Sequence, residues 1–455
     1  MLLVDLPRDI LEGIAQSLTT IDKKSLPSLA LASRALCHPT QRQIFQSIFL
    51  TVRFHNSAIP YSSNPLSPPP HLTRLRNVLT ENPMLATYVQ EVQCTYLEIS
   101  PSIGLRNWMV DHGLLFAEIL ELLGDSPIKY LSILSTPCPS SILTNWTSFH
   151  NTLQQTLIHR IFNKGTLSSV HIGGFSLPQN VFRAFVRLTD VCLGDVLWLP
   201  RDDDLFHSEE PSSYSNKQIQ STGNSPLQRL SSLRVTISDT RNASLEILGP
   251  EMGFELTRLQ TLQLDLVIAV PRSSIDRFLL LPNLKDLTIS FPPRSPAFNT
   301  NTPPTGIDLN AALKLRNLTL LHNLFFLDLD DFSWIGPTLS SLQPTVALRT
   351  LTITIILCSH ISDYSHTSDT TEFTVAFTTL SQTLSCFHRV FESKLERIGV
   401  EIELIYPERK ESVELFKRQI EEHLVWDGCG DVLMLTVAAV EGFTMRVDAD
   451  ASPQF

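Results

Sequence analysis

The chain has 455 residues, which is too long for a single compact core, so we expect several domains or a stack of repeats. Hydrophobic residues make up 43% of the chain and charged residues 18%, a balance that excludes disorder throughout. The formal net charge of −11 provides no broad cationic field, so we expect binding neither to nucleic acid in general nor to an anionic membrane surface.

The cysteines and the start of the chain bear on the cellular compartment. Seven cysteines are scattered singly, and because no two form a C-x-x-C pair, we expect neither a disulfide framework nor a four-cysteine zinc site. Asp5 and Pro7 interrupt the first apolar stretch, and no later run approaches the roughly 18 apolar residues of a membrane span. We therefore expect a protein of the cytoplasm or the nucleus, with no membrane segment.

Helical periodicity dominates the first 50 residues. The first predicted helix carries its apolar side chains on one face: Ile10, Leu11, Ile14 and Leu18. A second helix is predicted after Ser25, with Pro27 in its first turn, where a missing N–H is tolerated. A third is predicted to begin at Pro39 and to carry Ile44, Phe45 and Ile48. Residues 1–50 are thus predicted to form a small helical module.

Proline- and serine-rich segments divide the rest of the chain. Residues 51–72 predict a linker, because this composition favours extended, solvated backbone. Similar breaks predict long loops at 201–226, 291–306 and 358–371.

Between the breaks, one pattern recurs nine times: an apolar residue, two variable residues, an apolar residue, one variable residue and an apolar residue. The matches are Ile128/Leu131/Ile133, Leu167/Val170/Ile172, Leu188/Val191/Leu193, Leu230/Leu233/Val235, Leu259/Leu262/Leu264, Leu284/Leu287/Ile289, Leu315/Leu318/Leu320, Leu348/Leu351/Ile353 and Leu395/Ile398/Val400. From Leu233 to Leu351 the central residues follow one another at intervals of 29, 25, 31 and 33 residues, in or slightly above the range of leucine-rich repeats.

Helical patterns lie between several of these matches, so the fold class predicted for residues 73–455 is an α/β solenoid of strand and helix units. The central residues are predicted to lie in strands of one curved sheet with their side chains inward: Leu131, Val170, Leu233, Leu262, Leu287, Leu318 and Leu351. An ordinary layered α/β domain is the alternative, because short apolar runs are ambiguous.

Motifs that would indicate an enzyme are missing. The glycine-rich phosphate loops, the G-x-S-x-G elbow and the H-E-x-x-H zinc motif do not occur, so we expect no catalytic residue, cofactor or metal site. Cys358, His360 and His366 lie close in sequence, but their spacing fits no established zinc pattern. An enzyme whose site is assembled from loop residues is kept as a third hypothesis.

The variable positions of each predicted strand alternate to the face opposite the apolar side chains. These positions supply the candidate target-binding residues Arg234, Gln263, Asp265, Asp286, Thr288, Thr352, Arg397 and Glu401. Their mixture of hydroxyl, amide and both signs of charge suits a protein partner better than a phosphate backbone. The simpler alternative is a solvated sheet face.

The N-terminal residues resemble an F-box over about residues 4–50. The resemblance rests on the run Leu6-Pro7-Arg8-Asp9-Ile10-Leu11, on the segment Leu29-Ala30-Leu31-Ala32-Ser33-Arg34, and on Pro39 followed by Ile44-Phe45. It implies a three-helix module that docks on a Skp-type adaptor and, through it, on a cullin-based ubiquitin ligase. The residues that would bind the adaptor or support that surface are Leu6, Pro7, Ile10, Leu11, Ile14, Leu18, Leu29, Ser33 and Phe45.

The repeats resemble the degenerate leucine-rich repeats that follow F-boxes in many fungal proteins. The repeat's asparagine is present at Asn323 but replaced in other units, which favours an irregular solenoid. Together, the two resemblances imply the substrate-recognition subunit of a Skp–cullin–F-box ligase, with an unidentified target protein held by the solenoid. The alternative is an adaptor-independent binding scaffold whose N-terminal helices only cap the solenoid.

Overall fold

The computed structural model describes residues 6–53, 70–97, 112–136, 144–178, 181–194, 196–199, 227–237, 253–266, 272–291, 307–324, 332–357, 370–391, 394–404, 414, 417–418, 420–422 and 433–439. Most of the predicted linker at 51–72 and the whole of the predicted loop at 201–226 lie outside these residues. So do 292–306 and 358–369 of the other two predicted loops.

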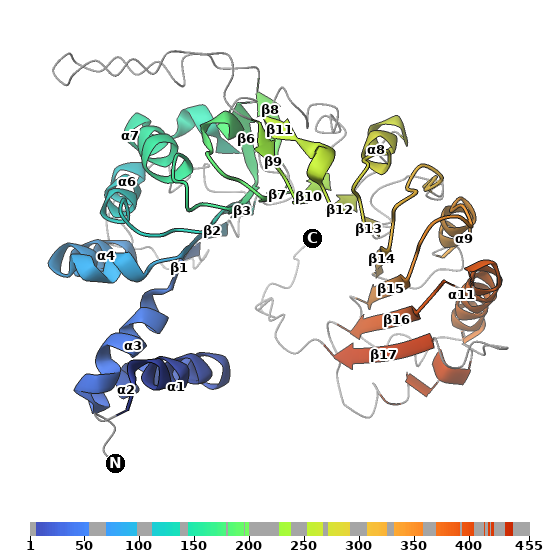
Figure 1. Ribbon diagram of the computed structural model, residues 1–455, viewed down its shortest axis with the longest axis horizontal. Helices are drawn as coiled ribbons and strands as arrows, with labels where there is room; N and C mark the ends of the chain where they lie inside the picture. The colour runs from blue at the N-terminus through green and yellow to red at the C-terminus, as the bar shows by residue number, and fades with distance from the viewer. Residues whose placement is uncertain are drawn as a thin grey trace, which may run out of the picture. The chain divides into compact units, whose positions relative to one another are not determined.

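The fold belongs to the mixed α/β class and is built on parallel strands with helices between them (Figure 1). The chain divides into two compact units. The first comprises Met1–Val235 with Ser244–Arg258, and the second comprises Thr236–Ala243 with Leu259–Phe455. The predicted fold class is thereby confirmed at the level of a parallel α/β architecture.

The first unit begins with three helices: α1 (Arg8–Ile21), α2 (Leu26–Ala32) and α3 (Arg34–Phe45), with a short turn η2 (Lys23–Ser25) before α2. Both α1 and α2 pack against α3. The buried residues of these helices are Leu11, Ala15, Leu26, Leu36, Pro39 and Thr40. The amphipathic spacing of α1 explains the arrangement, because Leu11 and Ala15 are one helical turn apart and share a face.

The predicted start of the third helix is wrong. The helix begins at Arg34, directly after Ser33, whose extended backbone (φ −152°, ψ 132°) separates it from α2. Pro39 lies inside α3, where it lacks the N–H of a helical hydrogen bond, and the hydroxyl of Thr40 bonds the carbonyl of Leu36 at 2.5 Å. Ile48 belongs to a strand rather than to this helix.

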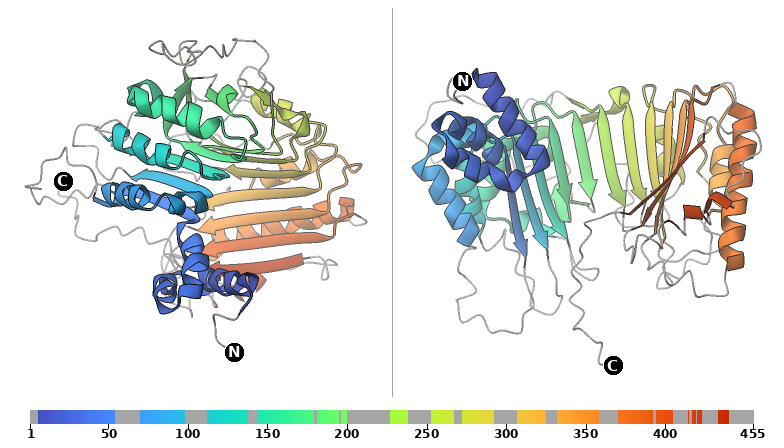
Figure 2. Two further views of the ribbon diagram at one scale, coloured as in Figure 1. Left: turned by 60° about the vertical axis from the view of Figure 1, so that its left-hand side comes forward. Right: turned by 90° about the horizontal axis from the view of Figure 1, so that it is seen from below.

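The sheet of the first unit contains β1 (Ser47–Arg53), β2 (Glu91–Leu97), β3 (Tyr130–Thr136), β5 (Ser169–Gly173) and β7 (Asp190–Gly194), parallel and hydrogen-bonded in that order. In register across them lie the buried residues Ile48, Val92, Leu131, Val170 and Val191. Figure 2 shows the strands coloured blue to teal pointing the same way. Parallel strands need crossovers, which explains the helices between them.

These crossovers are α4 (Pro70–Glu81), η3 (Pro83–Tyr88), α6 (Gly113–Leu122), α7 (Asn151–Thr156) and the π-helical turn η5 (Leu157–Phe162). Further along lie η6 (Val181–Ala184) and two small parallel sheets, one of β4 (Thr144–Asn145), β6 (Phe175–Pro178) and β8 (Leu197–Leu199), the other of β9 (Gln228–Arg229) and β11 (Phe254–Glu255). Strand β10 (Ser232–Ile237) begins at the end of this unit, and the turn η11 (Leu256–Arg258) completes it. Figure 1 shows α4, α6 and α7 along one face of the strands.

The sheet of the second unit contains β12 (Thr261–Leu266), β13 (Asp286–Phe291), β14 (Asn317–Leu324), β15 (Thr350–Leu357), β16 (Arg397–Leu404) and β17 (Leu433–Ala439), again parallel and in chain order. Its buried register row is Leu262, Leu287, Leu318, Leu351 and Ile398. Helices α8 (Arg272–Leu279), α9 (Ile335–Ser340) and α11 (Thr370–Phe391) follow β12, β14 and β15 and lie along one face (Figure 1). Burying one such leucine contributes about 1.5–3 kcal/mol.

In all nine sequence patterns the second and third apolar residues lie in a strand, and the first lies two residues before that strand begins. The seven central residues named above are at most 1% exposed. The strand and burial predictions are therefore confirmed. The two ends of the segment predicted as a linker, 51–72, overlap regular elements, since β1 runs from Ser47 to Arg53 and α4 begins at Pro70. The apolar residues that follow Phe45 continue into a sheet strand instead of ending the helical module.

Candidate functional site

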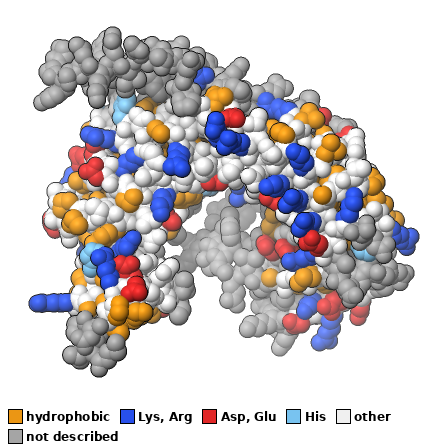
Figure 3. Space-filling model, viewed as in Figure 1, with side chains coloured by type: hydrophobic (Ala, Val, Ile, Leu, Met, Phe, Trp, Pro, Cys, Tyr) orange, Lys and Arg blue, Asp and Glu red, His pale blue; other side chains and the backbone are white. Residues whose placement is uncertain are grey.

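The first candidate site is the solvent-facing surface of α1 and α2. Helix α2, of sequence LPSLALA, is almost wholly apolar and buries only one of its residues, Leu26, so its other residues are partly or fully exposed. Leu31 is 89% exposed, and Ile10 on α1 is 48% exposed. Figure 3 shows hydrophobic side chains gathered on the N-terminal helices. Exposed apolar surface on a unit that already has its own core is a feature of interaction sites.

The predicted adaptor-binding residues fall into three groups by exposure. Pro7 and Ile10 are exposed, and Leu11 is buried and supports the surface from within. The partly exposed group is Leu6, Ile14, Leu18, Leu29, Ser33 and Phe45. Leu31, which is 89% exposed, is not among the residues predicted from the sequence, although a helix as apolar as α2 cannot bury all of its side chains in so small a core.

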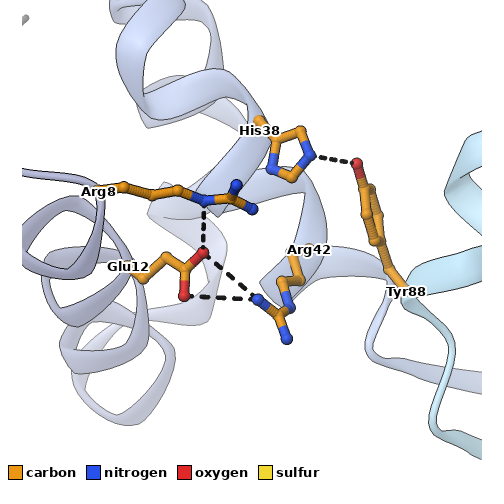
Figure 4. Close-up of polar contacts among 5 residues, drawn as sticks. All are labelled: Arg8, Glu12, His38, Arg42 and Tyr88. Carbon is orange, nitrogen blue, oxygen red and sulfur yellow. Dashed lines mark hydrogen bonds and ion pairs between the residues drawn. The ribbon is translucent and has the colours of Figure 1, made fainter.

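An ion-pair network connects α1 to α3 (Figure 4). The Nε atom of Arg8 lies 3.0 Å from Oε1 of Glu12, and Nη1 of Arg42 lies 3.3 Å from the same oxygen. Pairs as exposed as these contribute little to stability. They nevertheless place polar and charged groups at the start of α1, where Ile10 is exposed.

The helices are joined directly to the sheet of the first unit. A single residue, Gln46, separates α3 from β1, and its carbonyl accepts hydrogen bonds from the backbone N–H groups of Gln90 (2.9 Å) and Glu91 (3.0 Å). The ring of His38 on α3 is hydrogen-bonded to the hydroxyl of Tyr88 at 2.8 Å, as Figure 4 shows. Backbone and side-chain contacts therefore hold the helical module against the first strands.

The second candidate site is the outward face of the sheet in the second unit. The side chains on this face alternate with the buried rows, and all the predicted target-binding residues of this unit are partly exposed: Gln263, Asp265, Asp286, Thr288, Thr352, Arg397 and Glu401. Arg234 is exposed and belongs to the first unit. The predicted alternation of the strands is thus observed for every candidate.

Many of these polar groups already bond one another across the strands. Asp286 accepts hydrogen bonds from the hydroxyl of Thr261 at 3.3 Å and from the side-chain amide of Asn317, whose own oxygen accepts from Thr350. This row continues in register to Arg397. The row is a hydrogen-bonded ladder whose carboxylate and amide groups keep further acceptor and donor positions for a target.

A second row is paired in the same way. The carboxylate of Asp265 accepts hydrogen bonds from Thr236 at 3.4 Å and from Gln263 at 3.0 Å. The guanidinium of Arg397 lies 3.7 Å from the carboxylate of Glu401, two positions beyond Gly399 on the same face. Gly399 lies between the two charged residues along the strand, and the Nε of Arg397 is 3.7 Å from the position that a Cβ of Gly399 would occupy, which is an ordinary contact distance.

The outward face of the first unit holds polar groups that the sequence patterns did not single out. The hydroxyl of Ser47 donates to Glu91 at 2.7 Å, and His171 and Cys192 are register neighbours on β5 and β7. Burial, together with the positive charge of Arg234, lowers the pKa of the His171 imidazole, which is therefore neutral at pH 7. These residues occupy the variable positions of their strands. The repeat pattern could therefore have predicted that their side chains lie on the outward face.

Within the described part of the chain, no group of three or more His, Cys, Asp or Glu side chains is placed to hold a metal ion. Cys358, His360 and His366 lie outside the described residues. No helix in the described ranges combines the length and the apolar character that crossing a bilayer requires. Neither family models of known proteins nor curated protein sequences match this chain.

Proposed function

We propose that the chain is the substrate-recognition subunit of a Skp–cullin–F-box ubiquitin ligase. Its helices α1 and α2 bind a Skp-type adaptor, and the outward faces of its strands bind a target protein. The observation that carries the proposal is the apolar surface of α1 and α2, with Ile10 48% and Leu31 89% exposed beside an independent buried core. Covering a leucine this exposed contributes about 2 kcal/mol to binding.

The direct joining of α3 to β1 supports this proposal. A ligase subunit of this kind contributes proximity rather than chemistry, so the target-binding surface must be held in a defined place relative to the adaptor. The hydrogen bonds of Gln46, and the bond between His38 and Tyr88, hold the first strands against the helices. A flexible linker at this junction would reduce the effective concentration of the target.

The alternative function is an adaptor-independent scaffold in which the helices only cap the sheet. The contact between α3 and η3 favours it, because a terminal cap must pack on its neighbouring unit. A cap has no need of a leucine as exposed as Leu31, and this residue distinguishes the two functions.

Co-purification of the full chain with a Skp-type adaptor tests the proposal. The parent chain should form a stable complex, and the variant Ile10→Asp/Leu31→Asp should not, since it introduces two charges into the apolar surface. The matched control is Leu280→Asp/Leu313→Asp, which changes two leucines that are 69% and 56% exposed in the second unit. A parent chain that binds no Skp-type adaptor, or variants that co-purify alike, would exclude the adaptor-binding function and leave the scaffold.

A further inference from the structure

The residues immediately before the strands of the second unit form a continuous row. The backbone N–H of Arg316 donates to the carbonyl of Lys285 at 2.8 Å, and that of Arg349 donates to the carbonyl of Arg316 at 2.7 Å. The N–H of Glu396 in turn donates to the carbonyl of Arg349 at 2.8 Å. The three cationic residues Lys285, Arg316 and Arg349 therefore lie side by side where adjacent strands begin, about 4.8 Å apart.

This row, Lys285, Arg316 and Arg349, is here named the basic row. Arg316 and Arg349 are exposed, and Lys285 is partly exposed. Lys314 and Lys394, on the segments that lead into β14 and β16, are exposed and add further positive charge. In the view of Figure 3, Lys and Arg side chains gather where β13 and β14 begin. A concentration of cations is unusual on a chain whose formal net charge is −11.

The charges of the basic row are only partly neutralised by the protein itself. The amine of Lys285 donates to the amide oxygen of Gln260 at 3.2 Å, which is a neutral partner. Arg349 lies 3.4 Å from the carboxylate of Glu396, in an exposed pair. Arg316, between the two, forms no ion pair with any residue that the structure describes. Like charges on neighbouring strands are unfavourable unless an anion lies over them.

We propose that the basic row binds an extended acidic segment of a partner protein. An extended peptide advances about 3.3 Å per residue, so carboxylates within a run of about four residues span the same distance as three adjacent strands. Guanidinium groups bind carboxylates in a bidentate manner and suit this task. A nucleic acid fits less well, because the row is short and is flanked by the carboxylates of Asp286 and Glu396.

This inference deepens the target-binding half of the proposed function, on which it rests, by stating the chemistry of the target. Adaptor binding plays no part in it. A direct titration of the chain with a peptide, in the absence of adaptor, therefore separates failure of the basic row from failure of the F-box function.

The experiment titrates the full chain into a fluorescein-labelled peptide that carries a run of glutamates, with the matched glutamine peptide as a reference, and follows fluorescence anisotropy. The parent should bind the glutamate peptide in preference, and less tightly as salt is added. Lys285→Gln/Arg316→Gln/Arg349→Gln should lower the affinity about tenfold or more. Arg389→Gln/Lys417→Gln/Arg418→Gln removes the same charge elsewhere in this unit and should change it less than about twofold.

A further variant changes the affinity in the opposite direction. Glu396→Gln removes the carboxylate that competes for Arg349, so it should tighten peptide binding about twofold to threefold, a gain that misfolding cannot produce. The proposal is overturned if the parent chain does not bind the glutamate peptide more tightly than the glutamine peptide. It is overturned as well if the two triple variants lower the affinity equally, or if Glu396→Gln lowers the affinity for the glutamate peptide. It is also overturned if a single-stranded oligonucleotide displaces the peptide and binds more tightly to the same row.

Discussion

Two leucines of α2 form a matched pair, because they share one short helix and differ in exposure. Leu26 is 0% exposed and Leu31 is 89% exposed. Truncating each to alanine in the full chain removes the same atoms from the same helix. The pair therefore separates the stability of the helical module from its capacity to bind a partner.

The expected magnitudes differ in kind. Leu26→Ala leaves a cavity in a core that contains few other side chains, so it should destabilise the module by about 2–5 kcal/mol. Leu31→Ala loses little contact within the chain and should change stability by less than about 0.5 kcal/mol. It should instead lower the affinity for a Skp-type adaptor by about 2 kcal/mol, a loss of roughly thirtyfold.

Hydrogen exchange measured by mass spectrometry reads the local stability, and a titration with adaptor reads the affinity. Amide exchange in α1, α2 and α3 should accelerate at least about thirtyfold in Leu26→Ala and stay unchanged in Leu31→Ala. The reasoning is refuted if Leu31→Ala accelerates exchange as much as Leu26→Ala does. It is refuted equally if Leu31→Ala binds the adaptor as the parent does.

Four further predictions concern Gly174, Cys94 and Lys164 of the first unit, with Cys386 as a comparison. Gly174→Ala should destabilise the protein by more than about 2 kcal/mol, because Gly174 has φ +80° and a methyl group there would collide with the carbonyl oxygen of Ser135. Gly165→Ala is the control, because its methyl group meets no atom within 4 Å. Equal melting temperatures of the two variants would contradict the prediction. Burial raises the pKa of the Cys94 thiol well above its ordinary value, so Cys94 should resist alkylation in the native state while exposed Cys386 reacts, as mass spectrometry would show. The same shift lowers stability as the pH rises above about 9, because the thiol then ionises in the unfolded chain and stays protonated in the folded one. Lys164→Met should lower the free energy of unfolding by about 1–3 kcal/mol, because the Lys164 amine donates to the backbone carbonyls of Leu123 at 2.9 Å and Ser126 at 2.7 Å. Urea unfolding measures this loss, and an unchanged midpoint would show that solvent replaces both hydrogen bonds.

The strands were predictable because one spacing of apolar residues recurs and each copy is buried. The same spacing also occurs at Phe45/Ile48/Leu50 and at Val89/Val92/Cys94, which are not among the nine predicted matches. The last two residues of each triplet lie in β1 and β2. In the first of these, helical periodicity masked the strand, and in the second a cysteine takes the place of an aliphatic residue. Free cysteine packs as a small apolar side chain, and Cys94 is 1% exposed.

The surfaces were less predictable, because side-chain exposure depends on tertiary packing. Periodicity put Ile10 and Leu11 on the same face of the first helix, but it could not show that Leu11 is buried and Ile10 exposed. It likewise gave no reason to separate Leu31 from Leu29 on so apolar a helix. The basic row could have been found from the repeat interval. Lys285, Arg316 and Arg349 each precede the central leucine of their unit by two positions, so the intervals that align those leucines align the cations as well.

Isothermal titration calorimetry of the full chain with a Skp-type adaptor, repeated at several temperatures, tests the central claim most directly. Burial of an apolar surface on binding gives a negative change in heat capacity. We predict one adaptor bound per chain, with a negative heat-capacity change that becomes smaller in magnitude in the Leu31→Ala variant. Absence of binding, or binding whose heat-capacity change is unaltered by Leu31→Ala, would contradict the assignment of α1 and α2 as the adaptor-binding surface.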